Sequence, residues 1–106
     1  METDKPTRPT TMRLGVRVDC IERTDRASPY HRIRGIGGLG SDGLHWRLTE
    51  DAVIAAIDQE RAAFYIESPI GHRIEIVAAQ GLGKRYLKTE SDGESPDRLL
   101  GLRDCD

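Results

Sequence analysis

The stretch Leu44–Ile57, LHWRLTEDAVIAAI, decides the fold class, because its hydrophobic period changes from that of a strand to that of a helix. Over residues 44–48, apolar and polar side chains alternate, which is typical of an extended segment. Thr49 is a good helix N-cap, and two acidic residues follow it where they complement the helix dipole. We therefore expect one helix over residues 50–60. Its apolar stripe comprises Val53, Ala56 and Ile57.

The other regular segments alternate with period two, as half-buried strands do. We expect strands at 14–20 and 30–36 before the helix, and at 64–67, 74–78 and 85–89 after it. The connections between neighbouring strands are short, which favours antiparallel pairing. The predicted fold is therefore α+β, a small antiparallel sheet of about five strands with one helix on one face, in the order β-β-α-β-β-β.

The expected core is small. Because so few apolar side chains offset the chain entropy only narrowly, we expect modest stability, and a homodimer that covers the second face of the sheet would add to it. The expected core residues are Leu14, Val16, Val18, Ile33, Trp46, Val53, Ile57, Phe64, Ile66, Ile74, Ile76 and Leu87.

The length of 106 residues suits one small domain. Residues 1–11 are polar and charged after Met1, so we expect a disordered arm followed by a single α+β domain over residues 12–106. The net charge of −2 conceals an asymmetry, because the acidic segment from Glu90 onward carries −4 and leaves +2 for the rest. The total charge excludes binding of nucleic acid by bulk positive charge alone.

The expected location of the protein and the expected state of its cysteines both depend on features that the sequence lacks. No apolar run approaches the ~20 residues that span a bilayer. Residues 1–12 lack the apolar core of a signal peptide, so a cytoplasmic location is the default expectation. Cys20 and Cys105 form no C-x-x-C pair and are too few for a disulfide framework. We expect Cys20 to be an inert buried thiol and Cys105 to be exposed near the chain end.

Two glycine-rich stretches look like phosphate-binding loops but lack the context of one. Gly35–Gly40 matches G-x-G-x-x-G, yet the expected helix begins about ten residues later. Gly81–Lys84 lacks the P-loop spacing and is better explained as a hairpin turn. His31, His45 and His72 are scattered without the spacing of a zinc site. We therefore expect no cofactor, no metal and no catalytic residues, and the sequence leans away from an enzyme.

From Gly37 onward the residues resemble a known bacterial family. The resemblance is densest in Arg85–Thr89, RYLKT, and continues through Asp92–Gly93 to Cys105. On these residues the chain resembles the uncharacterised family catalogued as domain of unknown function 3892, over about residues 30–106. The resemblance implies a small stand-alone bacterial protein, and it implies no particular reaction.

The basic residues of the predicted strands suggest one kind of partner. A sheet face that combines Arg, Lys and Tyr side chains can hold single-stranded nucleic acid through phosphate pairing and base stacking. A solvated outer face explains the same pattern, since the side chains do not all share one parity. The candidate nucleic-acid-binding residues are Arg32, Arg34, Arg73, Arg85, Lys88 and Tyr86.

Three hypotheses for function follow. The first is a non-catalytic binding or accessory module for a macromolecular partner, with a protein partner or a homodimer as its expected form. The alternatives are a nucleic-acid-binding protein that uses the basic sheet face, and a small-ligand binder that uses the glycine-rich loop 37–43 as a lid.

Overall fold

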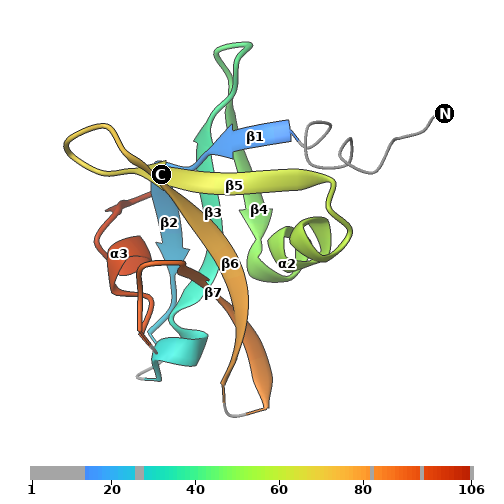
Figure 1. Cartoon of the computed structure of the whole chain (residues 1–106), viewed down its shortest axis with the longest axis vertical. Coiled ribbons are helices and arrows are strands. Elements are labelled where there is room, and N and C mark those ends of the chain that lie inside the picture. The colour runs from blue at the N-terminus through green and yellow to red at the C-terminus, as the bar shows by residue number, and fades with distance from the viewer. Residues whose placement is uncertain (1–13, 26–27, 82, 94, 106) are drawn as a thin grey trace, which may run out of the picture.

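The computed structural model describes residues 14–25, 28–81, 83–93 and 95–105, without the side chains of Leu14 and Pro29 (Figure 1). The arm expected over residues 1–11 lies outside these ranges. The described elements are, in chain order, β1 (Leu14–Arg17), β2 (Cys20–Arg23), η1 (Pro29–His31), β3 (Ile33–Leu39), β4 (His45–Thr49), α2 (Glu50–Asp58), β5 (Ala62–Glu67), β6 (Arg73–Gly81), β7 (Lys84–Thr89), α3 (Asp97–Leu100) and β8 (Arg103–Asp104).

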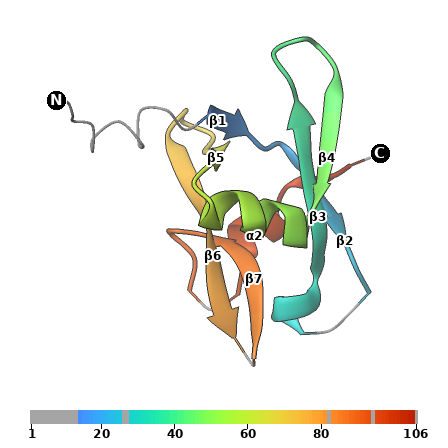
Figure 2. The ribbon, with the colours of Figure 1, turned by 90° about the vertical axis from the view of Figure 1, so that its right-hand side faces the viewer.

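The strands form two sheets rather than one. The first has the order β1-β5-β6-β7 and the second the order β4-β3-β2-β8. The main helix α2 contacts strands of both sheets, as the turned view in Figure 2 shows. The α+β class is confirmed, but the single antiparallel sheet of about five strands is wrong, because β1–β5 and β2–β8 are parallel pairs.

The predicted first strand is interrupted at Val18 and Asp19, and this break produces the second sheet. The amide of Val18 donates to Tyr65 O at 2.8 Å, whereas the next amide, that of Asp19, donates to Gly37 O at 3.0 Å. Adjacent residues thus bond to different sheets. The period-two pattern continues through the break, since Val18 and Cys20 are both buried, and for that reason it predicts a single strand.

The glycine-rich loop expected over residues 37–43 is wrong at its start, because β3 continues through Gly37 and Gly38. A side chain at Gly38 would place its Cβ 2.5 Å from Arg17 O, where the end of β1 crosses the second sheet. A side chain at Gly37 would place its Cβ 2.7 Å from Trp46 O. These glycines therefore serve close packing inside a strand, and the hairpin turn itself begins at Gly40.

The helix and most of the expected core are confirmed. Thr49 caps α2 by accepting a hydrogen bond from Ala52 N at 3.2 Å, and the helix ends at Asp58, two residues before the predicted end. The core also includes residues that the expectation missed, such as Ile21, Ile36 and Leu99. Leu99 anchors the short helix α3, so the acidic C-terminal segment packs against the body at this point.

None of the helices in the described part of the chain has the length and hydrophobicity of a membrane span.

Both ends of the main helix α2 form hydrogen bonds with the first sheet. At its beginning Glu50, which is buried, accepts hydrogen bonds from Lys84 Nζ at 2.6 Å and from Leu87 N at 3.3 Å. At its end Asp58 accepts two hydrogen bonds from Arg85, at 2.7 and 2.9 Å.

Candidate functional site

Cys20 and Cys105 form a disulfide that joins residues 85 positions apart. The expectation of two separate thiols is wrong, although the burial expected for Cys20 is correct. The chain end returns to the edge of β2, where Cys20 pairs with Arg103 in parallel and Cys105 N donates to Ile21 O at 2.8 Å. No spacing in the sequence predicts this long-range return, and the even number of cysteines was the one signal for it.

The disulfide forms part of the wall of a cavity of about 310 Å³ on the β4–β3–β2–β8 sheet, which we call the disulfide groove. Gly37 lies between Cys20 and Arg47 in the sheet register. A Cβ at Gly37 would lie 3.0 Å from Cys20 Sγ and 3.1 Å from Arg47 Cγ, so the missing side chain keeps the floor of the groove open. The groove is lined by Cys20, His45, Trp46, Arg47, Arg103 and Cys105.

The two arginines of the disulfide groove are held in place by carboxylates beside it. Arg47 donates to Glu22 across the sheet, and Arg103 Nη2 lies 3.3 Å from Asp19 Oδ1. Among the described residues that line the groove there is no Asp or Glu, so every ionisable side chain of its lining, the disulfide apart, is a basic one. The groove therefore presents cationic groups next to a disulfide.

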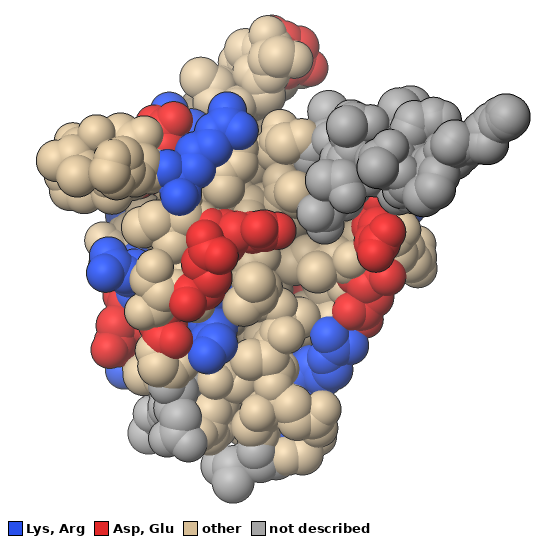
Figure 3. All heavy atoms as spheres, in the orientation of Figure 1, with Lys and Arg blue, Asp and Glu red and all other residues tan. Residues whose placement is uncertain are grey.

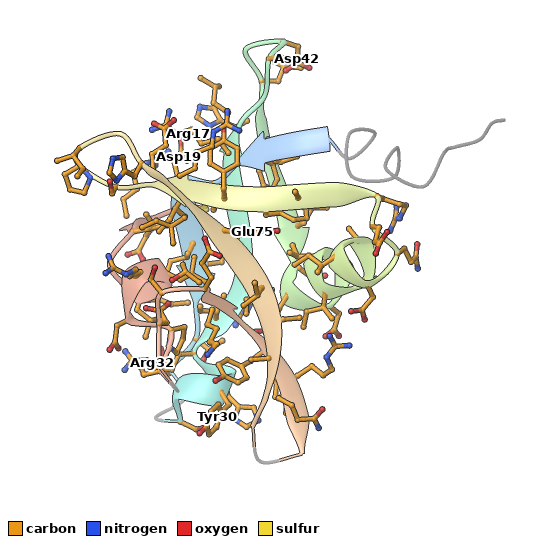
Figure 4. All side chains as sticks on the ribbon, in the orientation of Figure 1. Arg17, Asp19, Tyr30, Arg32, Asp42 and Glu75 are labelled. Carbon is orange, nitrogen blue, oxygen red and sulfur yellow. A yellow bond between two sulfur atoms is a disulfide. The ribbon has the colours of Figure 1, made fainter. Side chains whose placement is uncertain are left out.

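The β3–β4 hairpin carries a second candidate surface. It projects beyond the body of the molecule in both ribbon views, and Asp42 marks its tip in Figure 4. Leu39 is 54% exposed, Leu44 67% and Leu48 39%, and these are three of the four large exposed hydrophobic residues in the described part of the chain. We call these three residues the hairpin leucines.

The strand β4 is the last strand of its sheet, so among the described strands its outer edge has no neighbour, and we call it the open edge of β4. Gly40 N donates to Leu44 O at 2.8 Å, and alternate residues of an antiparallel strand bond to the same neighbour. Leu44, Trp46 and Leu48 therefore direct their backbone groups toward β3. His45 and Arg47 direct theirs away from it, where they form a ready template for another strand.

The six candidate nucleic-acid-binding residues do not gather on one face. Tyr86 is buried with its ring 4.8 Å from that of Tyr30, in an edge-on arrangement. Arg85 is engaged by Asp58, and Lys88 Nζ donates to the carbonyl groups of Asp92 and Gly93, at 3.3 and 3.0 Å.

Of the remaining three candidate residues, Arg34 and Arg73 lie on strands, and Arg32 lies between η1 and β3. Arg32 follows η1, where Figure 4 shows it near Tyr30, and its Nε is buried without a hydrogen-bond partner. Arg34 is exposed at the start of β3. Arg73 lies on β6 with its guanidinium carbon 4.2 Å from the centroid of the Tyr65 ring.

Tyr65 and Arg73 line a second cavity, of about 320 Å³, on the β1–β5–β6 face. Two carboxylates, those of Glu75 and Glu90, line it as well. On the side of the molecule drawn in Figure 3, the described basic and acidic side chains are interspersed. The lining of this cavity thus combines the aromatic residues Phe64 and Tyr65 and the cation Arg73 with the two carboxylates.

One ion pair, between Asp58 at the end of α2 and Arg85 on β7, shifts the pKa values of both of its members. Arg85 donates two hydrogen bonds to Asp58 and holds the pKa of that carboxyl below its ordinary value of 3.8. The same hydrogen bonds raise the pKa of Arg85. Neither group lines either of the two cavities described above, and the pair connects the end of the helix to β7.

The described residues contain no group of three His, Cys, Asp or Glu side chains that could hold a metal ion. The ligand-binding lid expected at residues 37–43 begins inside β3, so the part left for a loop is the hairpin tip.

A family model described as "Protein of unknown function (DUF3892)" matches residues 17–103, which is most of the chain and includes most of both sheets. No curated protein and no solved structure matches the chain. The comparison agrees with the resemblance carried by the RYLKT segment, and the matched range contains the hairpin and most of the disulfide groove.

Proposed function

The chain belongs to the DUF3892 family, whose description assigns no activity, and we propose from its surface that it is a non-catalytic binding module for a protein partner. The β3–β4 hairpin and the open edge of β4 form the docking surface. The observation that carries the proposal is the exposure of the hairpin leucines beside a strand edge that pairs with no other described strand. Apolar side chains next to an open edge suit a partner that adds a strand.

The chemistry of β4 favours an acidic partner strand over a second copy of this chain. Two β4 strands paired antiparallel about Arg47 would place two guanidinium groups directly opposite each other, which is unfavourable. An extended segment with carboxylates on one face would meet His45 and Arg47, and its apolar residues on the other face would pack against Leu44 and Leu48. A homodimer formed through this edge is therefore the less favourable arrangement.

The proposal is tested by affinity capture from the native host, with quantitative mass spectrometry and three forms of the full chain. The wild type is compared with the double variant Leu39→Ser/Leu44→Ser and with Ile70→Ser. Ile70 is a matched control, because it is 76% exposed but lies in the β5–β6 turn. We expect a specific protein that binds the wild type and Ile70→Ser, and binds the hairpin variant at least about tenfold more weakly.

Hydrogen exchange on the purified complex then locates the interface. Binding should protect the amides of His45 and Arg47, since these face the open edge of β4. A partner that binds the hairpin variant as well as the wild type, or protection confined to another strand, would contradict the proposal. So would the capture of no macromolecule together with a successful turnover assay.

The location and the domain boundaries are part of the same proposal. We propose a cytoplasmic protein with residues 12–106 as the folding unit and residues 1–11 as an arm. Disulfides in the cytosol are usually transient, catalytic or redox-sensing, so this location requires the Cys20–Cys105 bond to be reversible. Limited proteolysis with mass spectrometry tests the boundary, and cleavage confined to the first residues supports it.

Nucleic-acid binding remains the alternative, and the stacking of Arg73 on Tyr65 favours it locally. A cation and an aromatic ring at one surface suit a base and its phosphate. A mobility shift of a single-stranded probe that weakens with salt, and that Arg73→Gln reduces, would support this function. The absence of any shift at about 50 mM salt would remove it.

A further inference from the structure

Both sulfur atoms of the molecule's disulfide belong to residues that line an open cavity with basic walls. We propose that the disulfide groove is a thiol–disulfide exchange site for a small thiol that carries a negative charge. The groove shares His45 and Arg47 with the β4 edge of the proposed docking surface, but the hairpin leucines do not line it, so variants of these leucines and variants of the groove test the two proposals separately. It assigns a chemical role to Cys20 and Cys105, which the proposed docking surface does not use.

The two cysteines differ in accessibility, and this selects the sulfur that is attacked. Cys20 is 4% exposed and lies on β2, whereas Cys105 is half-buried and follows the two-residue strand β8. A thiolate that enters the groove therefore attacks Cys105 Sγ. Gly37 is a positioning residue for this approach, since a side chain there would occupy the space beside Cys20 Sγ.

The exchange is balanced without a further oxidant. The incoming thiolate forms a new sulfur–sulfur bond to Cys105 Sγ, the Cys20–Cys105 bond breaks, and Cys20 Sγ leaves as a thiolate that water protonates. A second thiolate then attacks the sulfur of the bound small thiol, releases it as a small symmetrical disulfide and leaves Cys105 as a thiolate. The small thiols are oxidised, and the two cysteines of the chain are reduced.

The charge of the groove selects the thiol. Arg47 and Arg103 line the groove with no carboxylate among its described lining residues, and Glu22 and Asp19 hold the two guanidinium groups from beside it. Each guanidinium has more N–H donors than one carboxylate accepts. Positive groups also stabilise the leaving thiolate of Cys20 and lower the barrier to exchange.

The test measures the initial rate of disulfide loss from the intact oxidised chain with three small thiols of similar size. These are 3-mercaptopropionate, 2-mercaptoethanol and cysteamine, which are anionic, neutral and cationic, and each rate is divided by the thiolate concentration. The preference is the rate constant of the anionic thiol divided by that of the neutral thiol. We expect this preference to be about fivefold larger for the protein than for a small uncharged reference disulfide. Mass spectrometry should place the mixed disulfide on Cys105.

The variants Arg47→Gln and Arg103→Gln should each reduce this preference, and Arg73→Gln should leave it unchanged, because Arg73 lines the other cavity. Urea unfolding confirms that each variant is folded before rates are compared. A preference equal to that of the small reference disulfide would overturn the proposal. A disulfide that resists all three thiols until the chain unfolds would overturn it as well, since the bond would then be purely structural.

Discussion

At the scale of single residues, Gly38 shows how a missing side chain permits the two sheets to connect. The carbonyl oxygen of Arg17, at the end of β1, lies only 2.5 Å from the position that the Cβ of any other residue would take. A glycine in a strand interior normally weakens it, so its presence indicates a close approach of another backbone. Here that backbone is the segment that carries the chain from the first sheet to the second.

We predict that Gly38→Ala lowers the free energy of unfolding by about 2 kcal/mol, because the new methyl group requires backbone to move. The measurement is urea unfolding. Gly93→Ala is the control, since a Cβ at Gly93 meets nothing within 4 Å. That variant should stay within about 0.5 kcal/mol of the wild type, and equal losses in both variants would contradict the explanation.

Glu50 is the second residue whose role depends on contacts across the molecule. Its buried carboxylate accepts hydrogen bonds from Lys84 Nζ and from Leu87 N, so it connects the start of α2 to β7. From the sequence it is one of two acidic residues that complement the helix dipole. The structure distinguishes the roles of these two acidic residues, because Glu50 is buried and Asp51 is exposed.

We predict that Glu50→Gln destabilises the fold by about 2 kcal/mol, since it leaves a partly buried ammonium group without its counter-ion. Asp51→Asn removes a charge from the same helical turn and should cost only about 0.5 kcal/mol. Thermal and urea unfolding of both variants measure the difference. Similar losses would show that the helix dipole, and not the contact with Lys84, explains the effect.

At the scale of secondary-structure elements, the end of α2 is held against β7 by a pair that responds to acid. Arg85 holds the pKa of Asp58 below its ordinary value of 3.8, mainly through its hydrogen bonds. A carboxyl whose pKa is lowered on folding contributes stability that is present above the unfolded pKa. That contribution is lost as the pH falls through the lowered folded value.

We therefore predict that the stability difference between the wild type and Asp58→Asn is constant at neutral pH and narrows below about pH 4. Urea midpoints measured across the acid range provide the test. Added salt should reduce the neutral-pH difference, because both groups are exposed to solvent. A difference that persists at the lowest pH would show that the asparagine acts through packing and not through the ion pair.

The elements that could be predicted from the sequence are those whose neighbours are close in the chain. The helix cap at Thr49 and the strand pairs β5–β6 and β6–β7 depend on local patterns and short turns. The break at Val18 could not be predicted, since both sides of it are buried and the alternation is uninterrupted. The two parallel pairs join strands far apart in sequence, and neither has a local pattern.

At the scale of the whole molecule, the C-terminal segment closes the second sheet. Arg23 contributes to this closure by donating to Leu100 O and Leu102 O, each at 3.1 Å, and by pairing with Asp104. The disulfide adds a covalent tie between β2 and the residue after β8. A bond across 85 residues removes much entropy from the unfolded chain.

We predict that Cys20→Ser/Cys105→Ser lowers the free energy of unfolding by about 4 kcal/mol, and that reductant destabilises the wild type to a similar extent. Urea unfolding with and without reductant measures both effects. The double variant should be indifferent to reductant. A loss below about 1 kcal/mol would show that the noncovalent contacts of the C-terminal segment hold the fold alone.

The candidate site depends on spatial relations between strands that sequence patterns do not predict. The alternation of Leu44, Trp46 and Leu48 predicted an extended segment, but its pairing with β3 as an edge strand depends on the order of strands. The basic residues of the strands suggested one nucleic-acid face, yet Tyr86 is buried and Arg85 is paired with Asp58. The alternation along a strand shows which of its residues share a side of that strand. It does not show which sides of two different strands lie on the same surface of the molecule.

By itself, the sequence determined the α+β class, the position and cap of the helix, and the family, because these depend on local hydrophobic period, capping chemistry and residue identity. Only the tertiary structure decided the division into two sheets, the Cys20–Cys105 bond and the open edge of β4. The reason is physical. Pairings between residues far apart in the chain depend on which surfaces meet when the core forms, and local periodicity carries no information about that choice.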